Sequence, residues 1–424
     1  MLQHPKDRRD PLSRREFLRR AGATGVALPS LAAILAACGD DGGGDATTSS
    51  PGAGLQLARP DNPVTLPITD DNPPIADGLS PEGGPLKIFG YNDYIWKKIL
   101  NGFSDEYGVD VEYTVFDTPE QMVAKVQSNG ADFDIIVTVT LENVGKLAQG
   151  KLIQPLNATY IPNLAANVWD VFQSPFYDVG ARYTVPYIVY STGIGWRNDV
   201  VTDDIAAMDN PYDILWDQRF AGQTHLLNGS RDTLAAALLR MGADVNTDDP
   251  ATLDEAKQML LDGVQAMNWK FDHVDYNELG AFDIHQTWSG QIYYYQWFLP
   301  KGLDIGSFSY VWPPKAPGGR SGIITNDVFA IPRGAANPVL AHAMIDWMMD
   351  QRNAEPNYLS YEGFQPPLNA LTPDYILSTG SVPENLANIL IAKEDFALGV
   401  QELELAPAVN QLYQQIYQEV TGGA

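Results

Sequence analysis

Carboxylates beside aromatic residues are the side chains of this sequence that best suit a chemical role. Asp93 lies between Tyr91 and Tyr94. Asp232 follows a strand-like segment, and Asp327 opens an apolar one. An unpaired buried charge costs several kcal/mol, so a cation that leaves water needs a carboxylate partner. An aromatic face adds about 0.5–2 kcal/mol of cation–π attraction. These residues indicate a site for an organic cation, although each aspartate alone could be a helix cap or a surface acid.

Trp288 adds an aromatic wall to this set. It lies in the aromatic run 283–297 and precedes Ser289-Gly290, small residues that leave room beside a ligand. The sequence has no GxxxxGK[ST], HExxH, GxSxG or CxxC motif. We therefore predict neither an enzyme nor a cofactor nor a metal site. The segments Asp272-His273-Val274-Asp275 and Asp283-Ile284-His285 could hold a metal, but a loop histidine beside an aspartate is usually just solvated.

The elements that position these side chains begin with a β-turn-α-β unit. Leu86–Phe89 is a short apolar run that predicts a buried strand, and Val109–Val115 alternates like a second strand. Between them, apolar residues recur every four positions from Tyr94 until Gly108, which indicates an amphipathic helix. Ligands of such sheets bind outside the carboxyl ends of the strands. This places Tyr91, Asp93 and Tyr94 at the mouth of a cleft.

The alternation of strands and helices continues and indicates an α/β protein of two lobes. Phe133–Val139 is an uninterrupted apolar run, typical of a central parallel strand. Tyr183–Trp196 predicts two strands with a break at Ser191-Thr192, where the chain first crosses between lobes. Asp327–Ile331 predicts the return strand, and Leu398–Val420 an amphipathic helix. We predict lobe 1 over 85–190 and 324–375, and lobe 2 over 191–323 and 376–424.

The N-terminal residues predict export and a lipid anchor. Ser13-Arg14-Arg15-Glu16-Phe17-Leu18 matches a twin-arginine signal, and Leu35-Ala36-Ala37-Cys38 matches a lipobox, in which the Cys38 thiol is acylated. A transmembrane anchor is the alternative, but the apolar stretch is shorter than about 20 residues and contains glycine and proline. We predict a signal over 1–38 and a flexible tether over 39–84, rich in Gly, Asp and Pro.

Composition narrows the classes of partner. The 424 residues suffice for two lobes. The net charge of −26 argues against nucleic acid, which demands a basic surface. One cysteine excludes an internal disulfide framework. We predict a monomer that is tethered to a membrane.

Several stretches together resemble the spermidine/putrescine-binding family, the substrate-capturing proteins of polyamine ABC transporters. The resemblance runs from Leu86 to about Pro373 and rests on IFGYNDY, FDIIVTV, VPYIVYSTGIGWRND, RDTLAAALLRMG, QTWSG, NDVFAIP and GFQPPLN, in that order. It implies a two-lobed periplasmic-binding-protein-like fold of type II, each lobe a mostly parallel mixed sheet flanked by helices. It further implies a ligand cleft at the hinge, an ABC permease as partner and no catalysis.

Position by position, the resemblance implies roles for the residues named above. Its ligand-binding aromatics and acids resemble Tyr91, Asp93, Tyr94, Asp232, Trp288, Asp327 and Phe364. Three positions depart from the family: Gly229 replaces a second acid near Asp232, Thr325 replaces a Trp, and Leu141 falls near a Tyr. A short diamine, or a triamine with one poorly held end, is therefore expected to bind best. An opine, an amino-acid derivative or a metal chelate are alternative cargoes, and an exported hydrolase is the alternative outside binding proteins.

Overall fold

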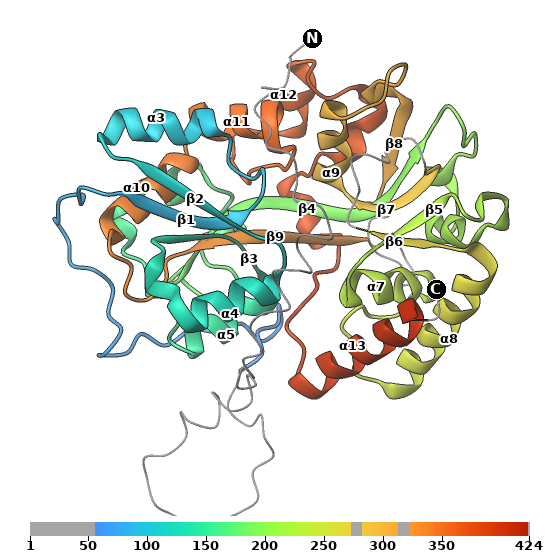
Figure 1. Ribbon diagram of the computed structural model, residues 1–424, viewed down its shortest axis with the longest axis horizontal. Coiled ribbons are helices and arrows are strands. Elements are labelled where there is room, and N and C mark those ends of the chain that lie inside the picture. The colour runs from blue at the N-terminus through green and yellow to red at the C-terminus, as the bar shows by residue number, and fades with distance from the viewer. Residues whose placement is uncertain (1–55, 273–281, 313–321, 423–424) are drawn as a thin grey trace, which may run out of the picture. The chain divides into compact units, whose positions relative to one another are not determined.

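One mixed β-sheet runs through both lobes (Figure 1). The structure, a computed structural model, describes residues 56–272, 282–312 and 322–422. The strands in these ranges are β1 (Leu86–Tyr91), β2 (Val111–Phe116), β3 (Ile135–Thr140), β4 (Thr184–Arg197), β5 (Thr224–Leu227), β6 (Lys270–Asp272), β7 (Ile284–Trp288), β8 (Phe308–Val311) and β9 (Ile323–Ala330). Their order is β2-β1-β3-β9-β4-β7-β5-β6, and β8 pairs with β4. The predicted signal 1–38, with Cys38, lies outside the described residues.

Helices flank the sheet in both lobes (Figure 1). They are α3 (Lys97–Tyr107), α4 (Pro119–Asn129), α5 (Leu141–Gln149), α6 (Pro162–Asn167), α7 (Ser230–Met241), α8 (Pro250–Met267), α9 (Ser289–Tyr294), α10 (Pro338–Met348), α11 (Gln351–Asn357), α12 (Pro373–Ser378) and α13 (Pro407–Gly422). Among the described residues, none of the helices is long and apolar enough to cross a bilayer.

Different helices cover the two faces of the sheet in the first lobe. Ile88 of β1 packs in the hydrophobic cluster that contains α3, while Phe89 packs in the cluster that contains α4 and α5. Successive residues of a strand point to opposite faces, so β1 is buried on both. Its neighbours β2 and β3 are both parallel to it, as predicted for a β-α-β unit. The predicted C-terminal stop of α3 is confirmed, because Gly108 has a φ of 67° there.

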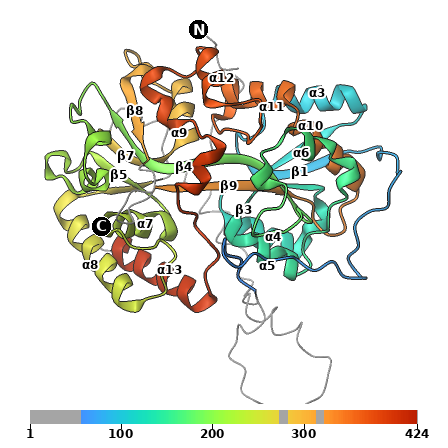
Figure 2. The same ribbon diagram turned by 180° about the vertical axis from the view of Figure 1, so that it is seen from behind.

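The prediction of two strands in Tyr183–Trp196 is wrong, because β4 is one strand. Residues from Thr184 to Thr192 pair antiparallel with β9, and those from Thr192 to Trp196 pair with β7. Ser191 and Thr192, the predicted break, are buried inside the strand at 0% and 3% exposure. The strand changes partner there without ending. The paired strands β4 and β9 therefore join the two lobes (Figure 2).

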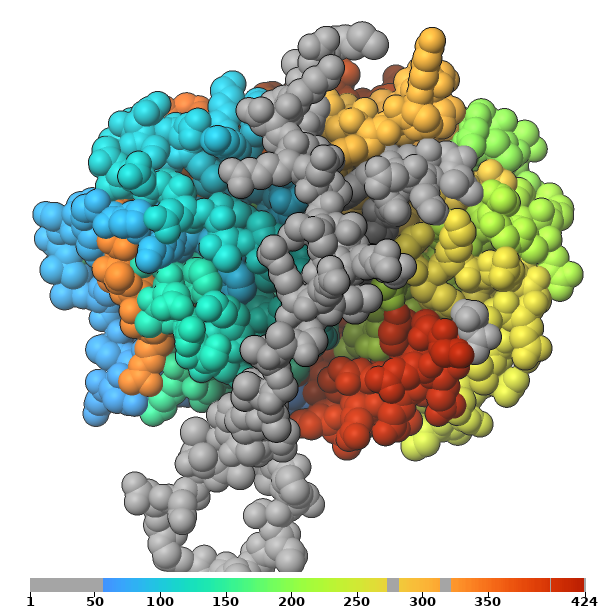
Figure 3. Space-filling view, in the orientation of Figure 1, coloured from blue at the N-terminus to red at the C-terminus, as the bar shows by residue number. Residues whose placement is uncertain are grey.

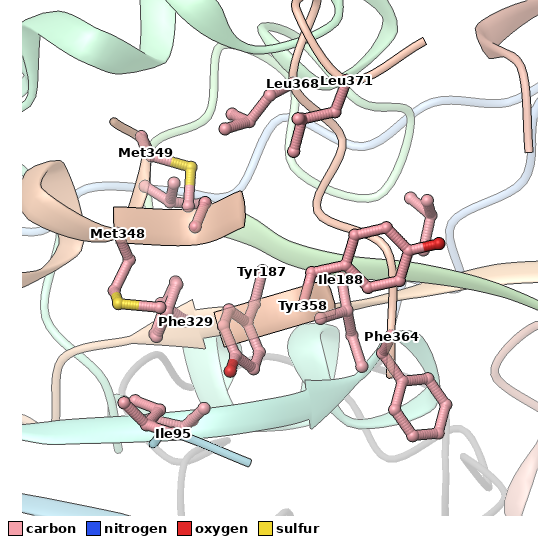
Figure 4. Packing of buried hydrophobic residues seen from close by; sticks show 14 of the residues in the cluster. Ile95, Tyr187, Ile188, Phe329, Met348, Met349, Tyr358, Phe364, Leu368 and Leu371 are labelled. Atoms are coloured by element: carbon pink, nitrogen blue, oxygen red, sulfur yellow. The ribbon is translucent and has the colours of Figure 1, made fainter. Parts of the chain in front are cut away.

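The large hydrophobic cluster extends from the sheet to the segment that carries Phe364 (Figure 4). Tyr187 of β4 packs on Phe329 of β9, with ring centroids 4.6 Å apart. Met348 at the end of α10, Tyr358 and Phe364 belong to the same cluster. Residues 358–364 are thus fixed against β4 and β9.

The folded part begins earlier in the chain than we predicted, so the tether cannot extend to residue 84. Residues 39–55 lie outside the described part, but 56–84 pack on the first lobe. Val64 and Leu66 are 2% and 0% exposed in the cluster with α4 and α5. The Asn72 side chain donates to the carbonyl of Ile153 at 3.0 Å. The segment is mostly polar in composition, but it contains these two apolar residues two positions apart. Their burial attaches the segment to the first lobe.

The C-terminal segment, which we predicted to belong to lobe 2, divides between two clusters. Tyr413 and Ile416 of α13 pack with α7 and α8, and α13 lies beside α8 on the surface (Figure 3). Ile376 of α12 and Leu386 instead pack in the large cluster with Phe364. That cluster also contains Ile292 of α9 and Phe308 of β8, which lie in the predicted lobe 2, so it does not decide where 376–424 belongs. The residue boundaries of the lobes stay a prediction.

Candidate ligand-binding site

The turn after β1 brings the first predicted site residues together. Asp93 has a φ of 60°, a left-handed conformation that aspartate tolerates better than most residues. The Asn357 side chain holds the turn, because its amide donates to the carbonyl of Tyr94 at 3.0 Å and its oxygen accepts from the backbone N–H of Trp96 at 2.7 Å. Trp96 is the N-cap of α3. Asp93 therefore does not cap this helix, which was the alternative explanation for it.

The Asp93 carboxylate accepts hydrogen bonds from two tyrosines that are distant in sequence. Tyr294 of α9 donates to it at 3.0 Å, and Tyr361 at 2.8 Å. The sequence pattern pointed to neither tyrosine as a partner of Asp93, since both lie about 200 residues or more away. Asp93 thus joins the turn after β1 to α9 and to residues 358–362.

An unbroken series of aromatic rings connects β1 to β7. The ring centroids of Tyr91 and Tyr94 are 5.5 Å apart. Tyr94 stacks on Phe364 at 5.6 Å, and Phe364 meets Tyr190 of β4 edge to face at 5.8 Å. Tyr190 in turn meets Trp288 edge to face at 6.4 Å. We call these five rings the aromatic series; it contains four of the predicted site residues and adds Tyr190.

The sequence suggested that Ser289-Gly290 leaves room for a ligand beside Trp288, but the Phe364 ring occupies the space beside Gly290. A Cβ atom on Gly290 would lie 2.4 Å from ring atoms of Phe364. Contacts below about 3.0 Å force one partner to move, so only glycine lets the Phe364 ring lie this close to α9. The space beside Gly290 is therefore filled by Phe364, a member of the aromatic series.

Asp327 is a buried carboxylate at the middle of the series. It lies on β9 with 3% exposure, and the Tyr190 hydroxyl donates to it at 3.3 Å. Burial raises the pKa of Asp327 to about 7, and the charge of Glu142 adds to the rise. An isolated carboxylate in these surroundings favours its neutral form near neutral pH.

Asp232 is the matching carboxylate of the second lobe. It lies in the first turn of α7, and its carboxylate hydrogen-bonds the side chain of Trp288. Burial raises the pKa of Asp232, and Glu142 contributes to the rise. A Cβ atom at Gly229 would lie 2.9 Å from Oδ2 of Asp232, so that carboxylate fills the space beside the glycine.

Two further acids, which we had not predicted, lie near these carboxylates. Glu402 is held beside α7, because Arg231 donates to the carbonyl of Leu403 at 2.9 Å. Burial raises the pKa of Glu402, and the negative charge of Asp232 raises it further. Glu142 lies in the first turn of α5 and acts electrostatically on both Asp327 and Asp232. Its place directly after β3, at the carboxyl end of a parallel strand, could have revealed it, whereas Glu402 lies beyond the stretch that resembles the family.

The remaining family departures are also explained by position. Leu141 is 5% exposed and packs in the hydrophobic cluster with α4 and β3. Thr325 is 6% exposed and pairs with Tyr190 across β4 and β9. Leu141 therefore provides core packing, and the polar group near this position comes from Glu142.

The arrangement suits the binding of a cation. Carboxylates from β9, α7, α5 and the 400–404 segment act on one another electrostatically around the aromatic series. Aromatic faces attract cations and cover methylene groups, and the carboxylates supply charged partners.

Comparison with known families gives this arrangement a context. A family described as bacterial extracellular solute-binding protein matches residues 98–375. The chain belongs to this family. This solute-binding protein is 25% identical over 272 residues to the spermidine/putrescine-binding periplasmic protein 1 of Haemophilus influenzae, a match that covers 63% of this chain and 71% of the relative. It is 27% identical over 273 residues to the spermidine/putrescine-binding periplasmic protein of Escherichia coli, covering 63% and 73%.

Solved structures share the fold of this solute-binding protein. The spermidine/putrescine ABC transporter substrate-binding protein of Streptococcus pneumoniae, solved with calcium and HEPES, matches with a TM-score of 0.63 and 22% identity over 80% of this chain and 98% of that one. The predicted two-lobed type II fold and the predicted family are therefore confirmed. The family is one of exported proteins that bind solutes for transport. The individual binding roles of Tyr91, Asp93, Tyr94, Asp232, Trp288, Asp327 and Phe364 stay predictions.

Proposed function

We propose that this solute-binding protein captures a linear polyamine, such as putrescine or spermidine, for an ABC importer. One observation carries the proposal: the buried carboxylate of Asp327 and the half-buried carboxylate of Asp232, from the two predicted lobes, meet one aromatic series. Asp327 accepts from Tyr190, Asp232 hydrogen-bonds Trp288, and these two rings contact each other at 6.4 Å. The names of the relatives from H. influenzae and E. coli point to the same class of ligand.

The raised pKa values of the buried acids favour a cationic ligand. Without a positive partner, burial disfavours the charged form of Asp327. An ammonium group beside the carboxylate would stabilise its charged form, so ligand charge and protein charge are desolvated together. The methylene groups between two amines would lie against the aromatic faces, so the aromatic series would be in contact with the apolar part of the ligand.

Glu402 could replace the carboxylate that is missing at Gly229. The sequence lacks the acid that family members carry there, and a poorly held amine was the expectation. Glu402 is held beside α7 by the bond from Arg231 to Leu403 and by one of 2.8 Å from Asn246 to the carbonyl of Gln401. We propose that Asp232 and Glu402 together hold one amine of the ligand, and that Asp93 and Asp327 hold another.

Capture would proceed by closure of the lobes. A ligand that contacts both lobes only in the closed state shifts the equilibrium toward closure. The paired strands β4 and β9 are the connection about which the lobes would move. The closed, loaded protein would then deliver its cargo to a membrane permease.

The route to the membrane is part of the proposal. The twin-arginine segment Ser13–Leu18 and the lipobox that ends at Cys38 occur in the order of an exported lipoprotein. Acylation of Cys38 would anchor the chain, and the residues between Cys38 and the folded part would act as the tether.

Calorimetry with putrescine, spermidine and a neutral amino acid tests the ligand class. We expect saturable binding of at least one polyamine at micromolar concentration, which corresponds to about −8 kcal/mol, and none of the amino acid. Tight binding of the neutral compound without polyamine binding would contradict the proposal. A thermal-shift panel with an opine, an amino-acid derivative and a metal chelate would then identify the cargo, since a ligand of the folded state raises the unfolding midpoint.

A further inference from the structure

A second cluster of chemically competent side chains lies in the second lobe, and the proposed ligand does not use it. His225 comes from β5, His285 from β7 and Asp272 from the end of β6. Strand β5 runs between the other two, and His225 pairs directly with His285. One ligand atom of each residue lies within 4.8 Å of the others. Parallel pairing thus brings together three residues that span 61 positions of the chain.

The contacts inside the cluster centre on the Asp272 carboxylate. Its Oδ2 lies 2.8 Å from Nδ1 of His225, and its Oδ1 lies 3.4 Å from Nε2 of His285. The two imidazoles are 2% and 1% exposed. Each oxygen of the carboxylate thus faces one of the two buried imidazoles.

The outer contact of His285 resembles that of a metal ligand. Nδ1 of His285 lies 3.0 Å from the hydroxyl of Tyr295, which fixes the ring and directs Nε2 toward Asp272. Metal-binding histidines generally use their second nitrogen in such a bond. Nε2 of His225 is buried and has no hydrogen-bond partner among the described residues. A buried polar atom rarely lacks a hydrogen-bond partner. The hydrogen bonds among the described residues therefore leave this nitrogen of the cluster unsatisfied.

We propose that His225, Asp272 and His285 bind a divalent transition-metal ion, with Zn²⁺ as the best match. Two imidazoles and one carboxylate are donors that zinc prefers. Tetrahedral ligands about 2.0–2.1 Å from zinc lie roughly 3.3 Å from each other. The three donors of the cluster lie within 4.8 Å of one another, so modest side-chain shifts would bring them onto one ion. Calcium and magnesium prefer six or more oxygen ligands and fit this set poorly.

The ion would tie together the strands that lead to the ligand-binding site. His285 lies on β7, which ends at Trp288, and His225 lies on β5, which is followed by Asp232. None of the three proposed metal ligands belongs to the aromatic series or to the acids around it. The proposal therefore stands or falls independently of the polyamine proposal, and it assigns the ion a structural role.

The test measures zinc alone, in mature chain that carries Cys38→Ser and no affinity tag, so that no thiol or tag contributes. After treatment with EDTA and dialysis, calorimetry and elemental analysis measure bound Zn²⁺. We expect one ion per chain and a rise of about 5 °C in the unfolding midpoint at hundredfold excess over Kd. Asp272→Asn and His285→Gln should weaken zinc binding at least about tenfold. His342→Gln is the matched control, because His342 is a buried histidine on α10, outside the cluster.

Two results would overturn the metal site: no saturable zinc binding by the wild-type chain, or equal zinc affinity in the wild type and both cluster variants. Circular dichroism separates loss of the site from loss of folding, since Asp272→Asn preserves the shape of the side chain. Polyamine titrations with and without EDTA keep the two proposals apart. If the chain binds a polyamine but does not bind zinc, only the metal site is refuted and the proposed function stands.

Discussion

At the scale of the residue, the main feature is a set of acids whose surroundings disfavour charge. Asp327, Asp232 and Glu402 all have raised pKa values because they are buried. Such groups cost stability unless a ligand or proton neutralises them. Ligand binding, protonation and the stability of the folded chain are therefore linked through these acids, and three predictions follow from that link.

The first prediction concerns Asp327→Asn. The change removes one charged partner of a buried ammonium, which commonly costs 2–5 kcal/mol. We expect polyamine affinity to fall roughly thirtyfold to several thousandfold, measured by calorimetry. Asp374→Asn, an exposed acid of α12, is the control and should bind like the wild type. Unchanged affinity in Asp327→Asn would remove this residue from the site.

The second prediction concerns Glu402→Gln. If Glu402 supplies the acid that Gly229 lacks, its amide variant should bind polyamine at least about tenfold more weakly. Removing a charge that is disfavoured in the folded protein should at the same time raise the unfolding midpoint of the ligand-free chain. Glu384→Gln, at an exposed position, is the control. Weaker stability with unchanged affinity would assign Glu402 a structural role.

The third prediction concerns pH. The pKa of Asp327 is about 7 in the folded chain and starts from 3.8. The folded state therefore holds a proton that the unfolded state has released, so this contribution to stability is full below pH 4 and is lost as the pH rises through 7. We expect this carboxyl to make the ligand-free chain roughly 2 kcal/mol less stable at pH 8 than at pH 5.

Thermal unfolding at the two pH values, with and without putrescine, measures the effect. Asp327→Asn should reduce the difference between pH 5 and pH 8. Putrescine should stabilise the chain more at pH 8, where the carboxylates are charged. A wild-type dependence that Asp327→Asn leaves unchanged would mean that other groups cause it.

At the scale of the element, close packing between α9 and residues 358–364 positions the aromatic series. Gly290, the second residue of α9, lies directly against the Phe364 ring. Phe364 in turn contacts both Tyr94 and Tyr190. A small displacement of this one ring would therefore reach the aromatic contacts of both β1 and β4.

The fourth prediction follows from this contact. Gly290→Ala places a Cβ atom 2.4 Å from the Phe364 ring, so the ring or the helix must shift. Overpacking of this kind typically costs 1–3 kcal/mol, and we expect a lower unfolding midpoint together with roughly tenfold weaker polyamine binding. Gly83→Ala is the control, because its Cβ would meet nothing within 4 Å. If Gly290→Ala unfolds like Gly83→Ala, the close approach is not a constraint.

At the scale of the whole molecule, the described chain is a two-lobed binding body whose N-terminal side is expected to be anchored. Strands β4 and β9 make the lobes parts of one sheet, and residues 56–84 pack on the first lobe. The predicted tether, which we expected over 39–84, therefore cannot extend beyond residue 55. A lipid on Cys38 would keep the binding body near its permease.

The fifth prediction tests this anchor. Cys38→Ser removes the only thiol of the chain, so the variant cannot be acylated and should be found in the soluble fraction. The acylated wild type should remain with membranes after a high-salt wash. Fractionation and immunoblotting measure the distribution, with Thr47→Ser in the predicted tether as the control. Equal membrane association of Cys38→Ser and wild type would refute the lipid anchor.

The sequence by itself determined the local elements and the family. The four-residue spacing before Gly108 and the apolar run Phe133–Val139 encode α3 and β3, because the burial of each depends on its own periodicity. The motifs that resemble the spermidine/putrescine-binding family were sufficient to identify the two-lobed fold. Tyr91 and Trp288 were found in the same way, because they lie at the ends of β1 and β7. Asp327, which we expected to open its strand, lies within β9.

The tertiary structure decided every feature that depends on which distant segments pair. Ser191 and Thr192 appear in the sequence as a break, yet exchange of the partner β9 for β7 buries them in one strand. Glu402 and Asp232 lie 170 positions apart and interact because the 400–404 segment is held by Arg231. Long-range hydrogen bonds and burial set such contacts, and local composition and periodicity carry no information about them.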